Sequence, residues 1–317
     1  MLIPNNLFEN VLVKPMLDGA GELCVVSGFA TAAMAFRHMQ YAKEKERNMK
    51  VRLLVGMCPS AGMPVSNHLG FKKLVEDDFR DHFECSYIAK HPAVHSKTYV
   101  WLQDGKPACG FTGSANYTQT AFGEKQREIM TPCDPVAAYD YYQSLLPDAI
   151  YCTHNDVDGL ISVYREQREK HETSESETLP PEVSGLERVK VSLLTKDGRV
   201  PTRSGLNWGQ RSSRDPNQAY LSLRSDVYNT DFFPERGTPF TVLTDDEKTI
   251  ICSRAQDHGK GIHTPHNNAL LGEYFRNRLG LASGAVVVAD DLRRYGRSDV
   301  HFYKIDDETY YMDFSTK

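Results

Sequence analysis

Residues 94–116 read VHSKTYVWLQDGKPACGFTGSAN and decide the fold of the first half of the chain. The apolar run Val94–Leu102 predicts a β-strand, and Ala108–Thr112 predicts a returning strand. Between them stands Asp104-Gly105, a favoured pair for a two-residue hairpin turn. The stretch therefore predicts a β-hairpin.

This hairpin brings polar side chains together. Residues i and i+2 of a strand share a face, so His95 and Lys97 are expected side by side. The returning strand places Gly113 and Ser114 near His95, and Asn116 follows. A glycine lets a phosphate approach the backbone, while hydroxyl and amide groups donate to its oxygens. A His-x-Lys strand is by itself more often a solvated face, but the joint pattern predicts a phosphate-reacting pocket.

Outside the hairpin, strand and helix signals alternate through the first half of the chain. This order predicts an α/β domain with a mixed sheet flanked by helices. The expected strands are Glu22–Phe29, Lys50–Met57 and Phe83–Ile88, and the expected helices are Ala30–Arg47, Phe71–Asp81 and Pro135–Leu146.

The second half of the chain is mainly β. Seven short strands and one helix, Asn268–Leu279, predict a small barrel-like domain. The expected strands are Val189–Thr195, Gln218–Arg224, Pro239–Thr244, Thr249–Ala255, Ala285–Asp290, Val300–Ile305 and Thr309–Phe314.

The boundary between the halves is rich in Ser, Thr, Glu and Pro. Residues 165–187 read REQREKHETSESETLPPEVSGLE, where no apolar periodicity survives. We therefore expect a first domain at 1–170, a linker at 171–186 and a second domain at 187–317.

The overall charge hides a division between these halves. The 317 residues include 37 Lys and Arg against 42 Asp and Glu, for a net charge of −5. Residues 185–317 carry +1, with 13 arginines, and the preceding residues carry −6. Arginine suits bidentate contacts with phosphates and guanines, so the second half is the candidate for binding DNA.

Several function classes are disfavoured by composition. No apolar run approaches the length of a membrane span, and polar residues interrupt the start of the chain where a signal peptide is apolar. The seven cysteines are scattered and form no Cys-x-x-Cys pair, which argues against a disulfide framework or a zinc knuckle. We expect a reduced cytoplasmic protein that does not enter a membrane.

The hairpin residues resemble the signature of the phospholipase D superfamily, His-x-Lys followed by Gly-Ser-x-Asn. Leu102 stands where many members have an aspartate, and Glu128 resembles the family's downstream acid. This pattern is similar to the restriction-endonuclease branch, and the wider sequence, including 259–281, resembles the NgoFVII-type restriction endonucleases. The resemblance implies a phospholipase D-like catalytic and dimerisation domain. It also implies a seven-stranded C-terminal pseudobarrel like the B3 DNA-binding domain of plant transcription factors.

The resemblance also implies a mechanism for cleaving double-stranded DNA. His95 attacks phosphorus and forms a phosphohistidine, Lys97 and Asn116 hold the non-bridging oxygens with help from Ser114, and Glu128 holds the imidazole. The lysine supplies positive charge, so we expect no metal cofactor. No P-loop surrounds Gly259-Lys260, so we expect no ATP site in this chain.

The expected active site is shared between two copies of the chain. The chemistry needs one histidine as nucleophile and another as acid, but the sequence holds one motif, and His91 before Pro92 is a poor second. We therefore predict a homodimer with one composite site. The resemblance leaves open a separate helicase-like ATPase subunit, and a restriction enzyme implies a cognate DNA methyltransferase.

Two polar loops are the predicted DNA-reading arms. Residues 199–214 contain four arginines and no acid, and a second loop covers 256–268. The alternative is that these loops contact phosphates alone. The predicted contact residues are Arg203, Asn207, Trp208, Gln210, Arg211, Arg214, Gln256, Asp257, Lys260 and Asn267.

Three other functions compete with site-specific cleavage. A non-specific phospholipase D-type nuclease would not need a base-reading domain. A phospholipase would be expected to carry an apolar membrane-facing surface and two copies of the motif. A binding module with an inactive catalytic half conflicts with the full set His95, Lys97, Asn116 and Glu128.

Overall fold

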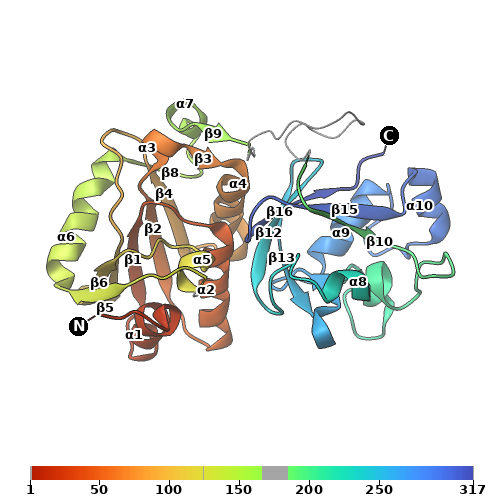
Figure 1. Cartoon of the computed structure of the whole chain (residues 1–317), viewed down its shortest axis with the longest axis horizontal. Helices are drawn as coiled ribbons and strands as arrows, with labels where there is room; N and C mark the ends of the chain where they lie inside the picture. Colours follow the sequence, from red (N-terminus) through yellow and green to blue (C-terminus); the bar gives the residue numbers. More distant parts are fainter. Residues whose placement is uncertain (1, 124, 166–184, 317) are drawn as a thin grey trace. The chain divides into compact units, whose positions relative to one another are not determined.

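The computed structural model describes residues 2–123, 125–165 and 185–316 (Figure 1). The chain divides into two compact units, Met1–Arg165 and Glu166–Lys317. The predicted linker lies almost wholly outside the described residues. No helix in the described part is long and apolar enough to cross a membrane.

The N-terminal unit is built on a mixed seven-stranded sheet, as the sequence predicts. Its strand order is β7-β6-β5-β1-β2-β4-β8, and β1, β2 and β4 are parallel while the other pairs are antiparallel. The strands are β1 Glu22–Ser27, β2 Lys50–Val55, β4 Phe83–Ile88, β5 Thr98–Gln103, β6 Lys106–Gly113, β7 Met130–Cys133 and β8 Ala149–Tyr151.

Helices cover both faces of this sheet. Figure 1 shows α6 (Pro135–Leu145) on one side and α2 (Ala32–Glu44) with α4 (Val65–Lys73) on the other. The helix predicted at 71–81 begins and ends earlier than expected. Helix α4 begins at Val65 and continues into the π-helical turn η2, Leu74–Asp78. The smaller elements are η1 Phe8–Val13, α1 Lys14–Leu17, α3 Cys58–Ala61, β3 Met63–Pro64, α5 Gln119–Phe122, η3 Leu146–Asp148, α7 Val157–Leu160 and β9 Val163–Tyr164.

Side-chain caps fix where the two longest of these helices, α2 and α6, begin. The Thr31 side chain accepts a hydrogen bond from the Met34 amide at the start of α2. Asp134 likewise accepts from the Val136 amide (2.9 Å), just before α6. Both satisfy amides that the first helical turn leaves without a partner.

The C-terminal unit is a nearly closed, barrel-like sheet of seven strands. The order is β10-β15-β16-β12-β13-β14-β11, and the two end strands contact each other. The strands are β10 Arg188–Ser192, β11 Leu221–Ser222, β12 Pro239–Thr244, β13 Thr249–Ala255, β14 Gly261–His263, β15 Asp299–Lys304 and β16 Thr309–Asp313. The helical elements are η5 Gly205–Gln210, α8 Ser225–Tyr228, η6 Asp257–Gly259, α9 Leu270–Arg278 and α10 Ala289–Tyr295.

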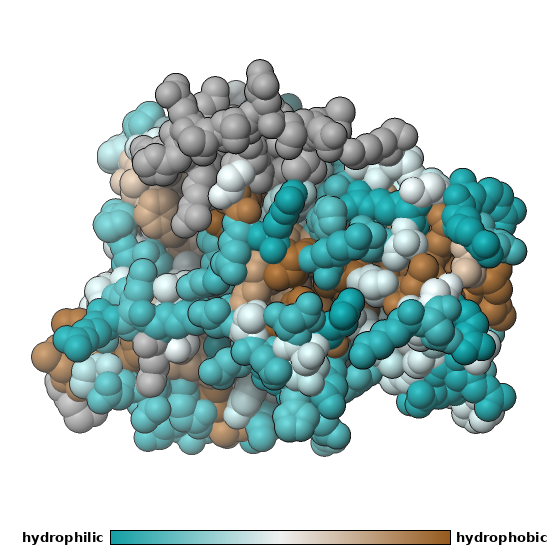
Figure 2. All heavy atoms as spheres, turned by 45° about the vertical axis from the view of Figure 1, so that its right-hand side comes forward, coloured by the Kyte–Doolittle hydropathy of each residue, from teal (hydrophilic) through white to brown (hydrophobic). Residues whose placement is uncertain are grey.

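An aromatic core fills this barrel. The rings of Phe233, Phe240 and Tyr310 contact one another with centroids 5.0–5.5 Å apart, and all three are buried. Burial of such rings supplies much of the hydrophobic stabilisation of a small domain. The visible face in Figure 2, which brings the C-terminal unit forward, is largely hydrophilic by contrast.

One predicted strand of this unit is wrong. Residues 285–290 form no strand, because the Val287 backbone bonds to the Asn207 side chain and α10 begins at Ala289. The seventh strand is instead β14, three residues that pair with β11 and β13. The predicted strand at Gln218–Arg224 is reduced to β11.

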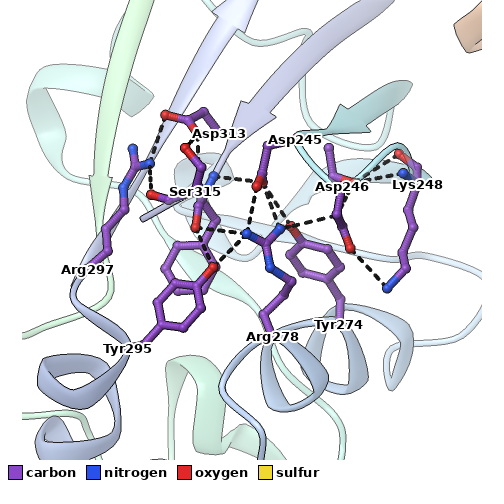
Figure 3. Close-up of polar contacts among 11 residues, drawn as sticks. Asp245, Asp246, Lys248, Tyr274, Arg278, Tyr295, Arg297, Asp313 and Ser315 are labelled. Atoms are coloured by element: carbon purple, nitrogen blue, oxygen red, sulfur yellow. Dashed lines mark hydrogen bonds and ion pairs between the residues drawn. The ribbon is translucent and has the colours of Figure 1, made fainter. Parts of the chain in front are cut away.

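A partly buried ion pair ties the last elements of this unit together (Figure 3). Arg278 of α9 makes two parallel hydrogen bonds to Asp245, at 2.6 and 2.8 Å, and a third to the Tyr295 hydroxyl of α10. It also donates to the carbonyl of Phe314, and Asp245 accepts from the Phe314 amide. Burial by itself lowers the pKa of Arg278, but Asp245 outweighs it and raises that pKa.

We expect Arg278→Leu to destabilise the C-terminal unit by about 3 kcal/mol, because it leaves the partly buried Asp245 carboxylate without its counter-charge. The measurement is urea unfolding of the full chain, followed by hydrogen exchange of the β12 and β16 amides. Arg293→Leu is the control, because Arg293 pairs with Asp290 on the exposed surface of α10. Equal losses in the two variants would contradict the prediction.

Candidate active site and DNA-binding surface

His95 and Lys97 lie side by side just before β5. The predicted strand Val94–Leu102 is wrong over its first four residues, because β5 begins at Thr98 and the two side chains extend from irregular backbone. The Nζ of Lys97 is 3.2 Å from the Nε2 of His95 and 2.6 Å from its carbonyl oxygen. Lys97 is 7% exposed, whereas His95 is exposed. Burial lowers the pKa of Lys97, and the negative charge of Glu128 opposes that shift. The pair presents a nitrogen nucleophile to solvent with an ammonium group directly beside it.

Ser114 and Glu128 meet where β6 ends and β7 begins. The Ser114 hydroxyl donates to the Glu128 carboxylate and accepts from the Ile129 amide at 3.1 Å. The backbone amide of Ser114 donates to the Ile129 carbonyl at 3.0 Å. Among the described residues, the carboxylate of Glu128 is thus bound by Ser114 rather than by His95. Its predicted role as the support of the imidazole is not met by a direct contact here.

Asn116 reaches the same site from the loop after β6. Its Oδ1 accepts a hydrogen bond from the Phe29 amide at 3.1 Å and lies 3.4 Å from the Ser27 hydroxyl. Because the Phe29 N–H can only donate, the atom facing it is the amide oxygen. The NH₂ group of Asn116 is the side chain's remaining donor and is suited to an anionic oxygen.

Gly28 is the common neighbour of these groups. A Cβ built on Gly28 would lie 3.0 Å from the His95 ring, 3.4 Å from Lys97 Nζ and 3.4 Å from Asn116 Oδ1. The structure therefore brings together three of the five predicted catalytic residues at the end of β1. This segment could not be recognised from the sequence, because Glu22–Phe29 is typical of an ordinary buried strand and its end carries no recognisable motif.

The first predicted arm forms a cationic and aromatic surface on the C-terminal unit. The guanidinium of Arg214 lies 4.0 Å above the Trp208 ring, and Tyr220 meets the same ring edge-on at 5.7 Å. Arg211 donates to the carbonyl of Arg203, and all three arginines are exposed. Guanidinium groups fixed in this way can contact phosphates or base edges.

The second arm approaches Tyr220, the residue just before β11, beside the pairing of β11 with β14. The side chains of Gln256 and Tyr220 both lie 3.2 Å from the position that a Cβ on Gly261 would take. Gln256 and Asp257 are exposed, and Lys260 Nζ lies 5.7 Å from the centre of the Tyr228 ring. Gln256 of the second loop thus lies near Tyr220, whose ring also meets Trp208 of the first loop.

Two buried arginines fix these loops from inside. Arg276 donates to the carbonyl of Leu206 in the first arm at 3.2 Å, and to that of Pro216 just after it at 3.1 Å. Arg254 donates to the carbonyls of Gly259 and His258 at the second arm, at 3.1 and 3.2 Å. They are 1% and 8% exposed, so they shape the loops instead of adding charge to the surface.

Three predicted DNA-reading residues have internal partners. Asn207 is fully buried and exchanges hydrogen bonds with the Val287 backbone at 2.7 and 2.8 Å. Gln210 donates to the Gly284 carbonyl at 3.0 Å, and Asn267 accepts from the Ala269 amide just before α9. The prediction is wrong for Asn207, because its amide is occupied and inaccessible to a base. The other two side chains help to hold the loop ends.

Comparison with protein families assigns both halves of the chain. Residues 5–159 match the model described as the NgoFVII restriction endonuclease N-terminal PLD domain. Residues 182–306 match the NgoFVII C-terminal B3-like DNA-binding domain. The fold and site thus define a phospholipase D-type nuclease domain joined to a DNA-binding domain. The chain belongs to the NgoFVII family of restriction endonucleases.

Solved structures match about half of the chain. NucT from Helicobacter pylori is 18% identical, over 48% of this chain and 97% of that chain, with a TM-score of 0.32. The phospholipase D family member Nuc from Salmonella typhimurium is 14% identical, over 47% and 93%, with a TM-score of 0.35. Polyphosphate kinase from Porphyromonas gingivalis matches 49% of this chain and 25% of its own, at 14% identity and a TM-score of 0.32. Comparison with curated proteins gives no match.

Proposed function

We propose that this chain is a site-specific endonuclease that cleaves double-stranded DNA through a phosphohistidine, without a metal ion, in a site shared by a homodimer. The convergence of His95, Lys97 and Asn116 around Gly28 carries the proposal. An imidazole, an ammonium group and an amide that face one another around a glycine support the proposal, because one phosphate can touch all three.

In the proposed first step, His95 Nε2 attacks the scissile phosphorus. A P–N bond forms while the P–O bond to the leaving sugar breaks, and a second histidine gives a proton to that oxygen. In the second step this histidine takes a proton from water, and the water oxygen attacks phosphorus. The P–N bond then breaks, which restores His95 and leaves a phosphate monoester on one DNA end.

The negative charge that develops on the non-bridging oxygens needs a counter-charge. Lys97 Nζ lies beside the attacking nitrogen, so it can follow the phosphate through both steps. Asn116 adds a neutral donor whose orientation is fixed by the Phe29 amide. Fixed donors of this kind stabilise a transition state without reorganising during the reaction.

We predict that cleavage persists in excess chelator, because Lys97 supplies the positive charge at the phosphate. Lys97→Met should reduce kcat about a hundredfold or more, with DNA affinity little changed. Lys106→Met is the control, since Lys106 is exposed at the hairpin turn. Gel assays of plasmid cleavage measure both effects. Activity that is lost in chelator and returns with Mg²⁺ would refute metal independence.

The homodimer follows from the number of histidines that the reaction needs. Each chain supplies one His-x-Lys pair, so the acid in the proposed mechanism comes from a second copy. Wild-type chains mixed and re-equilibrated with His95→Ala chains should then lose activity as the square of the wild-type fraction.

An equal mixture is expected to keep about one quarter of the activity of the same total amount of wild-type chain. The measurement is initial cleavage rate across a mixing series, with native mass spectrometry confirming that the subunits have exchanged. A linear decline to one half would show that each chain carries a complete site.

DNA recognition is proposed to use the exposed side chains of the two arms. Arg203, Arg211 and Arg214 provide the cationic groups, and Trp208 provides an aromatic face beneath one of them. A non-specific nuclease is the second candidate. Plasmid cleavage separates the two, because discrete fragments indicate site-specific cutting and a smear indicates general degradation.

We expect Arg203→Ala to weaken binding to the specific site about tenfold to a hundredfold, with a smaller loss on unrelated DNA, if Arg203 contacts a base. Fluorescence anisotropy with a cognate and a scrambled duplex measures both affinities. Arg293→Ala serves as the control, because this arginine pairs with Asp290 on α10. An equal loss on both duplexes would assign Arg203 to a phosphate.

The helicase-like ATPase subunit and the cognate methyltransferase stay predictions from the family resemblance. A restriction endonuclease acts on DNA inside the cell, so we propose that the enzyme is located in the bacterial cytoplasm.

A further inference from the structure

The segment Ser27-Gly28-Phe29 connects the end of β1 to the residues of the candidate site. Ser27 is fully buried, and its hydroxyl accepts from the Tyr117 amide at 2.9 Å and donates to the Phe29 carbonyl at 2.6 Å. The hydroxyl thereby joins two chain segments that are about ninety residues apart. One of these segments carries Asn116.

This segment also sets the orientation of the Asn116 amide. The Phe29 N–H donates to Asn116 Oδ1, so the amide oxygen faces the segment and the NH₂ group is left for another partner. Two neighbouring contacts hold the same loop. The backbone amide of Thr31 donates to the Tyr117 carbonyl, and the Tyr117 hydroxyl bonds to Nδ1 of buried His38 at 2.9 Å. The position of Asn116 therefore depends on the end of β1 as well as on its own strand.

Gly28 is explained by space and not by backbone conformation. Its φ is not positive, so an L-residue could adopt its backbone angles. A methyl group there would press on the His95 ring at 3.0 Å and touch Lys97 Nζ and Asn116 Oδ1 at 3.4 Å. The missing side chain leaves room where these three groups face one another.

Phe29 completes the contacts of the segment with the nucleophile. Its ring is 43% exposed and meets the His95 ring edge-on, with centroids 6.2 Å apart and planes at 80°. A large ring in that place restricts how the imidazole can turn on the solvent side.

We propose that Ser27-Gly28-Phe29 is the positioning element of the active site. The Phe29 amide points the Asn116 donor at the phosphate, Gly28 keeps open the space for a phosphate oxygen, and Ser27 fixes the loop that carries Asn116. The proposal deepens the proposed function, because it concerns the same phosphate site. It assigns a role to three residues outside the His-x-Lys and Gly-Ser-x-Asn patterns.

We predict that Gly28→Ala lowers kcat about a hundredfold while KM and DNA affinity stay near wild type, because small displacements of reacting groups are costly. Gly21→Ala is the matched control, since Gly21 lies just before the same strand and a Cβ there meets nothing within 4 Å. Steady-state cleavage of a cognate duplex and anisotropy measure these values. Equal activity of Gly28→Ala and wild type would overturn the proposal, as would equal losses in both variants.

A second measurement does not depend on cleavage. In the full chain, hydrogen exchange of the Phe29 amide should quicken about tenfold or more in Asn116→Ala and stay slow in Asn116→Asp, which keeps the acceptor. The aspartate variant should nevertheless be inactive, because it lacks the NH₂ donor. Unchanged exchange in Asn116→Ala would overturn the positioning role.

The two measurements distinguish this proposal from the function it rests on. A wild-type chain that cuts no DNA, together with the expected exchange pattern, would refute the proposed function alone. An active wild type with a fully active Gly28→Ala variant would refute the positioning element alone.

Discussion

The antiparallel pairing of β5 with both β1 and β6 is the constraint on which the active site depends. Val26 faces Thr98 across one pair, and Thr98 faces Thr112 across the other. The residues just beyond these positions therefore gather at one end of the sheet, although they come from three separate parts of the chain. A one-residue slip in either pair would turn its side chains to the opposite face and dismantle the site.

The hairpin itself could be predicted from sequence, because local chemistry determines it. Asp104 and Gly105 both have positive φ, at 52° and 73°, as the tight turn requires. Strands such as Pro239–Thr244 and Thr249–Ala255 have the predicted limits, since the first is buried throughout and the second is buried except at its two ends. In contrast, β14 is three residues long and follows a loop of polar residues, so periodicity could not reveal it.

What could not be predicted was the partner of each polar group. The alternating exposure of Val286, Val287 and Val288 looks like a strand, but a side-chain amide from Asn207 takes the place of a neighbouring strand. The same ambiguity affects the arms, where an arginine that contacts DNA and one that binds its own backbone look alike in sequence. Ser27-Gly28-Phe29 escaped notice for a related reason, because its contacts with the site are made by a backbone amide and by a missing side chain.

The buried arginines of the C-terminal unit bear on how such a domain could change over evolutionary time. Arg254 and Arg276 bind backbone carbonyl oxygens of the loops, and every residue type has such an oxygen. Replacement of the exposed side chains in these loops would leave these hydrogen bonds in place. Related enzymes could thus acquire new target sequences by surface substitution, while the shape that presents those side chains is inherited unchanged.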